Sequence, residues 1–168
     1  MVDSKGKSVY ERLSHPSSMM DAEMELLVTG VDALPVLESI FSGDAKNLFG
    51  MPYKEFGLAR QCALEIAVRM GSSAKLLEVY IRDEVLRGVQ PAAARAMRGF
   101  APLEDASVIA LAKNVGRSGS LDVSLESALT LVRLGYADHP AVLHQLSELP
   151  SAQSAWDWAL SSTSRSRS

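Results

Sequence analysis

GVDALPVL, residues 30–37, joins two apolar-striped segments, and GSSAKLL at 71–77 and GYADHPAVL at 135–143 repeat its form. Each stretch follows one segment with helical periodicity and precedes another, so each predicts the turn of a helical hairpin. A hairpin that recurs along a short chain predicts a stacked α-solenoid, a fold that usually serves as a surface for holding a partner.

Working outward from these turns, the helical period persists from residue 18 to residue 150. Met20, Met24, Leu27 and Val28 mark one face of the first predicted helix, and Ser18 with Asp21 has capping-box spacing. Proline and glycine fall at predicted helix boundaries almost throughout, and no run of alternating β-branched residues competes for a strand. The sequence therefore predicts an all-α protein.

The expected organisation has three parts. Residues 1–17 are expected to form a flexible N-terminal arm or a short cap laid on the first hairpin, and residues 18–160 the solenoid domain. A short last helix at 152–160 would cover the open end of the stack, and residues 161–168 form a disordered Ser/Arg tail.

Composition narrows the class of protein. Of 168 residues, 47% are hydrophobic and 22% charged, which fits a folded domain with a sizeable core. A net charge of −3 argues against a general nucleic-acid binder. Cys62 is the only cysteine, so it forms no intrachain disulfide and is expected to be a small buried residue. The polar N-terminus and the lack of a long apolar run predict a cytoplasmic protein without membrane insertion.

The inward alanine of successive first helices recurs at intervals of 33 and 32 residues, at Ala63, Ala96 and Ala128. With the Gly-x-x-Ala-x-Pro-x-Leu turn at 30–37 and the Ala-Arg-x-x-Ala-Leu core at 59–64, the chain resembles the HEAT-repeat family over residues 18–150. The resemblance implies a right-handed α-α superhelix of about four stacked hairpins. A tetratricopeptide array has a similar period, but its tryptophan and tyrosine signature is missing here.

The resemblance also implies where a partner binds, because second helices of HEAT-like units line the concave face. Carried onto this chain, the outward polar positions are Lys75, Glu78, Arg82, Lys113, His144, Gln145 and Glu148. Their mixed charge favours a protein or peptide partner over a phosphate backbone.

Two apolar features suggest docking elements. Leu48, Phe49 and Met51 fall in a predicted connection, where they either tuck into the seam between the first two hairpins or dock another protein. Trp156 and Trp158 point to different sides of the predicted last helix, so one is expected to cap the stack and the other, Trp158, to be free as an anchor.

No constellation predicts catalysis, a metal site or a cofactor. His139 and His144 are five residues apart, which places them on different helix faces, and there is no phosphate loop or nucleophile elbow. The leading hypothesis is a non-catalytic protein-binding adaptor or scaffold subunit of a larger assembly.

Two other hypotheses stay open. Some HEAT-like proteins are enzymes or enzyme subunits, so the resemblance allows a phycobilin-lyase-like role with a bilin-sized cleft or, less in keeping with the charge, a DNA-glycosylase-like role. A spectral change with a bilin or salt-sensitive DNA binding would reveal either. The chain could also be a piece of a longer array whose ends stack on further repeats.

Overall fold

The computed structural model describes residues 7–116 and 120–148, and it confirms an all-α protein for this part of the chain. Helices and short 3-10 turns follow one another, and an isolated β bridge joins Lys46 to Pro52. Contacts divide the chain into two compact units, Met1–Ile81 and Arg82–Ser168, with the division inside one helix. No helix in the described ranges is both long and apolar enough to cross a membrane.

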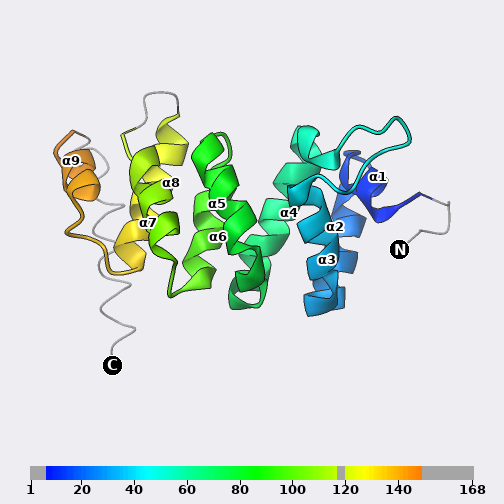
Figure 1. Ribbon diagram of the computed structural model, residues 1–168, viewed down its shortest axis with the longest axis horizontal. Coiled ribbons are helices and arrows are strands. Elements are labelled where there is room, and N and C mark those ends of the chain that lie inside the picture. The colour runs from blue at the N-terminus through cyan, green and yellow to red at the C-terminus, as the bar shows by residue number, and fades with distance from the viewer. Residues whose placement is uncertain (1–6, 117–119, 149–168) are drawn as a thin grey trace. The chain divides into compact units, whose positions relative to one another are not determined.

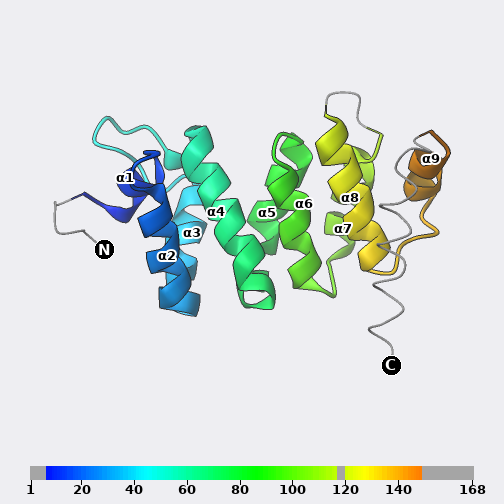
Figure 2. The same ribbon diagram turned by 180° about the vertical axis from the view of Figure 1, so that it is seen from behind.

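The first unit is built from pairs of helices that pack side by side. Its elements are α1 (Val9–Leu13), α2 (Met19–Thr29), η1 (Gly30–Ala33), α3 (Leu34–Ser42), η2 (Tyr53–Glu55), α4 (Gly57–Met70), η3 (Gly71–Leu77) and the start of α5 (Glu78–Arg87). Helix α2 packs against α4, and α3 contacts α4 as well (Figures 1 and 2). Fully buried Leu37, Ile40, Leu64 and Ile66 form much of the core between these helices.

Two of the quoted turns share one backbone conformation. Gly30 has φ 65° and ψ −133°, Gly71 has φ 55° and ψ −130°, and each glycine ends an α-helix. A side chain would be strained at these angles, which explains glycine at both positions. A 3-10 turn begins at each glycine and leads into the next helix, α3 or α5. The sequence similarity between the first two turns therefore reflects a repeated structure.

Helix α2 presents a different face to the core from the one expected. Ala22 and Leu26 are fully buried, whereas Met20, Met24 and Val28 are largely exposed. Leu27, the fourth residue of the predicted face, is half-buried, so that face is not the one in the core; apolar residues occur almost all round this helix, and two stripes therefore have helical spacing. Periodicity cannot choose between them; packing against α4 and α1 does.

The segment expected as an arm or a cap contains α1, which packs against α2 and α4. Val9 and Leu13 are buried there, so α1 packs onto the helices that follow it. The capping box lies at the start of α1, where Ser8 accepts from the Glu11 amide and Glu11 accepts from the Ser8 amide. Ser18 makes no side-chain cap on α2; its hydroxyl donates to the Arg12 carbonyl oxygen at 3.0 Å.

The second unit continues from the end of α5. Its further elements are α6 (Pro91–Met97), η4 (Arg98–Phe100), α7 (Asp105–Asn114), α8 (Leu121–Arg133) and α9 (Pro140–Glu148). Helix α8 packs against α6, α7 and α9, so it is the central helix of this unit. Phe100, Leu111, Leu131 and Val142 are buried in its core.

Small residues let α6 approach α8 closely. Ala92, Ala93, Ala94 and Ala96 of α6 are all buried, and so is Ala128 of α8. The three alanines aligned by the repeat period, Ala63, Ala96 and Ala128, are thus buried as expected. Alanine has a high helix propensity and little bulk, so it suits a close contact between helices.

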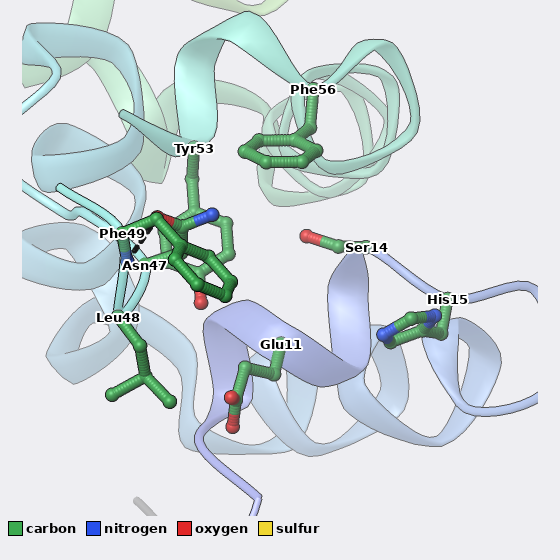
Figure 3. A pocket seen from close by; sticks show the side chains of 8 residues that line it. All are labelled: Glu11, Ser14, His15, Asn47, Leu48, Phe49, Tyr53 and Phe56. Carbon is green, nitrogen blue, oxygen red and sulfur yellow. Dashed lines mark hydrogen bonds between the residues drawn. The ribbon is translucent and has the colours of Figure 1, made fainter. Parts of the chain in front are cut away.

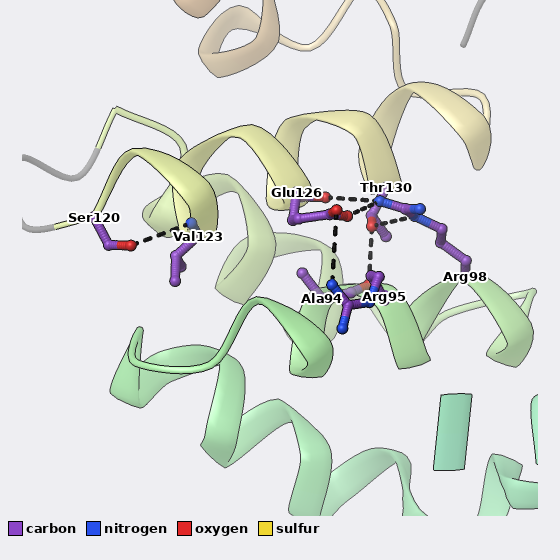
Figure 4. Close-up of polar contacts among 7 residues, drawn as sticks. All are labelled: Ala94, Arg95, Arg98, Ser120, Val123, Glu126 and Thr130. Atoms are coloured by element: carbon purple, nitrogen blue, oxygen red, sulfur yellow. Dashed lines mark hydrogen bonds and ion pairs between the residues drawn. The ribbon is translucent and has the colours of Figure 1, made fainter. Parts of the chain in front are cut away.

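Polar groups cross the α6–α8 contact and are paired (Figure 4). The Thr130 hydroxyl donates to the Ala94 carbonyl oxygen at 2.8 Å and accepts from Arg98 Nε at 2.9 Å. Glu126 pairs with Arg98 and lies 3.9 Å from Arg95. Burial lowers the pKa of the Arg98 guanidinium, although the Glu126 carboxylate opposes that shift. We assign this cluster to helix packing.

Helix α8 begins one residue before its first acidic side chain. Ser120 is the N-cap, and its hydroxyl accepts from the Val123 amide (Figure 4), while Asp122 lies inside the first turn. Both arrangements suit a helix N-terminus, since one supplies an acceptor to a free amide and the other places negative charge near the positive end. The predicted last helix at 152–160, with both tryptophans, and the tail at 161–168 lie outside the described residues.

Candidate functional site

The connection between α3 and η2 is a closed loop held by its own backbone. Helix α3 ends at Gly43, and the Ala45 amide then donates to the Ser39 carbonyl oxygen at 2.9 Å. The Tyr53 amide donates to the Ala45 carbonyl oxygen at 2.9 Å, next to the Lys46–Pro52 bridge. The two ends of the loop are therefore joined at its base, and we call residues 47–51 the docking loop.

Asn47 holds the tip of the docking loop. Its side-chain oxygen accepts from the amides of Phe49 at 2.9 Å and Met51 at 3.0 Å. Its backbone adds two bonds, from its own amide to the Met51 carbonyl oxygen and from the Gly50 amide to its carbonyl oxygen. Asparagine is suited to this role because its short amide reaches the amides that follow it. These hydrogen bonds within the loop fix the shape of its tip.

The docking loop presents apolar side chains to solvent. Leu48 is 93% exposed, Phe49 is 91% exposed and Met51 is 49% exposed. The interpretation that they tuck into a seam between hairpins is wrong, because that packing would have buried them. Adjacent exposed apolar side chains on an ordered loop are a recognised mark of an interaction site. Of the two interpretations drawn from the sequence, docking is the one compatible with this exposure.

A pocket of about 190 Å³ opens beside the docking loop (Figure 3). Its lining comes from α1 and the segment after it, from the docking loop, and from η2 with the residue that follows, and consists of Glu11, Ser14, His15, Asn47, Leu48, Phe49, Tyr53 and Phe56. Tyr53 is nearly fully buried, with its ring stacked on Tyr10 at 5.5 Å and tilted against Phe56 at 5.7 Å. This aromatic row is a firm wall for the pocket.

The polar groups around the pocket are ordered by α1. Glu11 Oε2 accepts from the Ser8 amide at 2.9 Å, and the Tyr10 hydroxyl is 3.0 Å from Ser39 Oγ. The pKa of Tyr53 is raised, chiefly by burial and to a smaller extent by the neighbouring Glu11 carboxylate. Tyr53 therefore stays neutral at physiological pH, and Glu11 is the single acidic residue among the described residues of the lining.

The predicted concave-face residues do not form one exposed set. Lys75 pairs with Glu78, which is buried and not outward-facing as expected. Arg82 pairs with Glu104 at 2.8 Å. The outward position of Glu78 was carried over from the second helices of HEAT-like units, whereas here Glu78 begins α5 directly after the 3-10 turn η3, whose residues per turn differ from those of an α-helix.

The predicted partner-binding residues of the second unit also differ in exposure. Lys113 and His144 are exposed as expected, whereas Gln145 is buried and accepts from Ser124 Oγ at 3.0 Å. Gln145 is therefore part of the packing between α8 and α9, and the outward assignment was wrong. Trp158 lies outside the described residues. The structure brings Phe49 and Met51 together on the docking loop, while the other predicted residues are spread over both units.

The partners of the docking loop on α1 and η2 were missed by the sequence pattern. Glu11 lies in a stretch with only weak helical periodicity, and the periodic pattern placed Phe56 at the start of the apolar stripe of the second hairpin, not beside the loop. One clue was the density of aromatic residues near the loop, because Phe49, Tyr53 and Phe56 lie within eight residues. Proximity to α1 could not be inferred, because that contact is tertiary.

The described part of the chain offers little support for metal binding or for a reactive thiol. No group of three histidine, cysteine or acidic side chains there is placed to hold a metal ion. Cys62 is buried as expected, and burial, with the neighbouring Glu23, raises its thiol pKa to about 12. Such a thiol is protonated and a poor nucleophile near neutral pH. Comparison of the chain with protein-family models, curated proteins and solved structures finds no match.

Proposed function

We propose that this protein is a non-catalytic binding module that holds a protein partner through the docking loop. The observation that carries the proposal is the exposure of Leu48 and Phe49, each above 90%, on a loop fixed by Asn47. Burying a phenylalanine or leucine side chain contributes about 1.5–3 kcal/mol. A loop already in its bound shape avoids much of the ordering cost of association.

The proposed architecture is a HEAT-like, right-handed α-α superhelix of about four hairpins. Supporting it are the shared conformation of Gly30 and Gly71, and the burial of all three alanines aligned by the repeat period. Repeat folds of this kind commonly act as scaffolds. We further propose a cytoplasmic protein that is one subunit of a larger assembly, with the docking loop as one of its contacts.

The test is a comparison of three full-length proteins: the natural chain, the double variant Leu48→Ser/Phe49→Ser and the control Met20→Ser/Val28→Ser. The control removes two exposed apolar side chains from α2, neither of which lines the pocket beside the loop. Each protein is used to capture partners from the cells that produce it, with quantification by mass spectrometry. Binding of the captured candidates is then measured with purified components.

The proposal expects a partner that binds the natural chain and the control alike and is lost from the loop variant. Both variants should keep the natural circular dichroism spectrum and thermal midpoint, because the replaced side chains are exposed. If every direct partner binds the loop variant with unchanged affinity, the docking loop is not the binding site and the proposal fails.

A further inference from the structure

The pocket beside the docking loop combines aromatic walls with a carboxylate, and the described residues that line it include no lysine or arginine. Phe49, Tyr53 and Phe56 supply the rings, and Glu11 supplies the acid. In Figure 3, Phe56 and Glu11 lie on opposite sides, with Phe49 between them. A group that contacts both rings and carboxylate needs an apolar stem and a positively charged end.

We infer that this pocket receives a basic side chain, arginine or lysine, from the segment of the partner that binds the docking loop. The inference rests on the proposed function and names the chemistry of the partner. Basic side chains lay their methylene stems along apolar surface while the charged head stays polar. Their heads are also attracted to aromatic faces, a contact that arginine makes more often than lysine.

The size of the pocket favours one side chain over a whole small molecule. Its volume of about 190 Å³ is below the roughly 300–1,000 Å³ of typical small-molecule sites. One wall, formed by Leu48 and Phe49, belongs to the loop that the partner is proposed to cover. A chain that lies on this loop can therefore place one of its side chains in the pocket.

Glu11 is held in place independently of any ligand. Its Oε2 atom is used by the Ser8 amide in the capping box of α1, and Oε1 has no donor among the described residues. The neighbouring Lys54 is directed elsewhere, since its Nζ donates to the Ser42 carbonyl oxygen at 3.1 Å. A partner's cation would thus meet a positioned carboxylate oxygen, an arrangement that favours a charge-assisted hydrogen bond.

The test uses capped single amino acids as probes of the full chain. N-acetyl-arginine amide, α-N-acetyl-lysine amide and N-acetyl-norleucine amide are titrated in millimolar amounts, and amide chemical shifts of the docking loop and α1 are followed by NMR. Saturable shifts are expected with the two cationic probes. Tighter binding of the arginine probe than of the lysine probe assigns arginine, and the reverse order assigns lysine.

Glu11→Gln separates charge from shape, because glutamine also suits the last position of a capping box. It should weaken both cationic probes about fivefold or more and leave norleucine unchanged. Equal binding of norleucine and the cationic probes, or unchanged cationic binding by Glu11→Gln, overturns the inference. The serine double variant in the docking loop is a separate test: if it loses a partner while the probes show no preference for charge, the proposed function stands and this inference fails.

Discussion

Leu26 and Met24 lie two residues apart on α2 and have opposite environments. Leu26 is fully buried, whereas Met24 is 55% exposed. Leu26→Ala should lower the free energy of unfolding by about 2–5 kcal/mol, because it removes buried methyl groups and leaves a cavity in a packed core. Met24→Ala should change it by less than about 0.5 kcal/mol, because the lost contacts are few and alanine favours the helix.

Urea unfolding of the full chain, followed by circular dichroism, measures both variants. With a denaturant slope of about 2 kcal/mol per molar, the midpoint for Leu26→Ala should fall by about 1–2.5 M. If the two units unfold in separate phases, only the phase of the unit that contains α2 should move. The natural chain and Met24→Ala should have midpoints within about 0.3 M of each other.

The opposite ranking would refute the packing described for α2. Met20, Met24 and Val28, with the half-buried Leu27, form the stripe that periodicity alone favoured, and they would face the core if α2 were rotated about its axis. In that arrangement Met24→Ala would be the costly change and Leu26→Ala the mild one. Urea unfolding of the two variants thus distinguishes the face of α2 that periodicity favours from the face that packs against α1 and α4 in the structure.

Three further predictions concern a packing contact, a thiol and the docking loop. Thr130→Val should cost about 1–3 kcal/mol, since it removes a bonded hydroxyl from the α6–α8 contact, whereas Thr130→Ser should cost less; thermal unfolding compares them. Cys62 should react with a thiol reagent near pH 8 about a thousandfold more slowly in the native protein than in urea, because its pKa is about 12. Equal reaction rates in the native and unfolded protein would contradict the raised pKa of the thiol. Between about pH 9 and pH 12 the native thiol keeps its proton whereas the unfolded thiol loses it, so the contribution of Cys62 to stability should fall as pH rises through this range. Asn47→Ala should speed hydrogen exchange at the amide of Phe49 while changing global stability by less than about 1 kcal/mol, and unchanged exchange would show that the side chain does not hold the loop.

Part of the candidate site could be predicted and part could not. Apolar side chains at Phe49 and Met51 in a connection suggest docking, but the same sequence pattern also suits a buried seam. Exposure separates the two, and exposure depends on where neighbouring elements pack. The contribution of α1 to the pocket could not be predicted from the sequence either, because Glu11 and Phe56 are far apart along the chain and only tertiary packing brings them together.

The outward assignments of Glu78 and Gln145 failed for a related reason. These positions were carried over from the second helices of HEAT-like units, but the segment before Glu78, η3, is a 3-10 turn and not part of a regular α-helix. A polar side chain can also be buried when another side chain forms a hydrogen bond or an ion pair with it. Lys75 pairs with Glu78, and Ser124 donates to Gln145, so each buried side chain has a polar partner.

By itself, the sequence determined the helical class and the places where helices end. Those features depend on local constraints: glycine at residues 30 and 71 adopts angles that other residues avoid, and proline at residue 91 suits the first turn of a helix. Which face of α2 enters the core, which polar residues are buried, and how α1 meets the docking loop were decided only by tertiary structure. These depend on contacts between segments distant along the chain, and helix α2 offers two apolar stripes from which only such contacts can select.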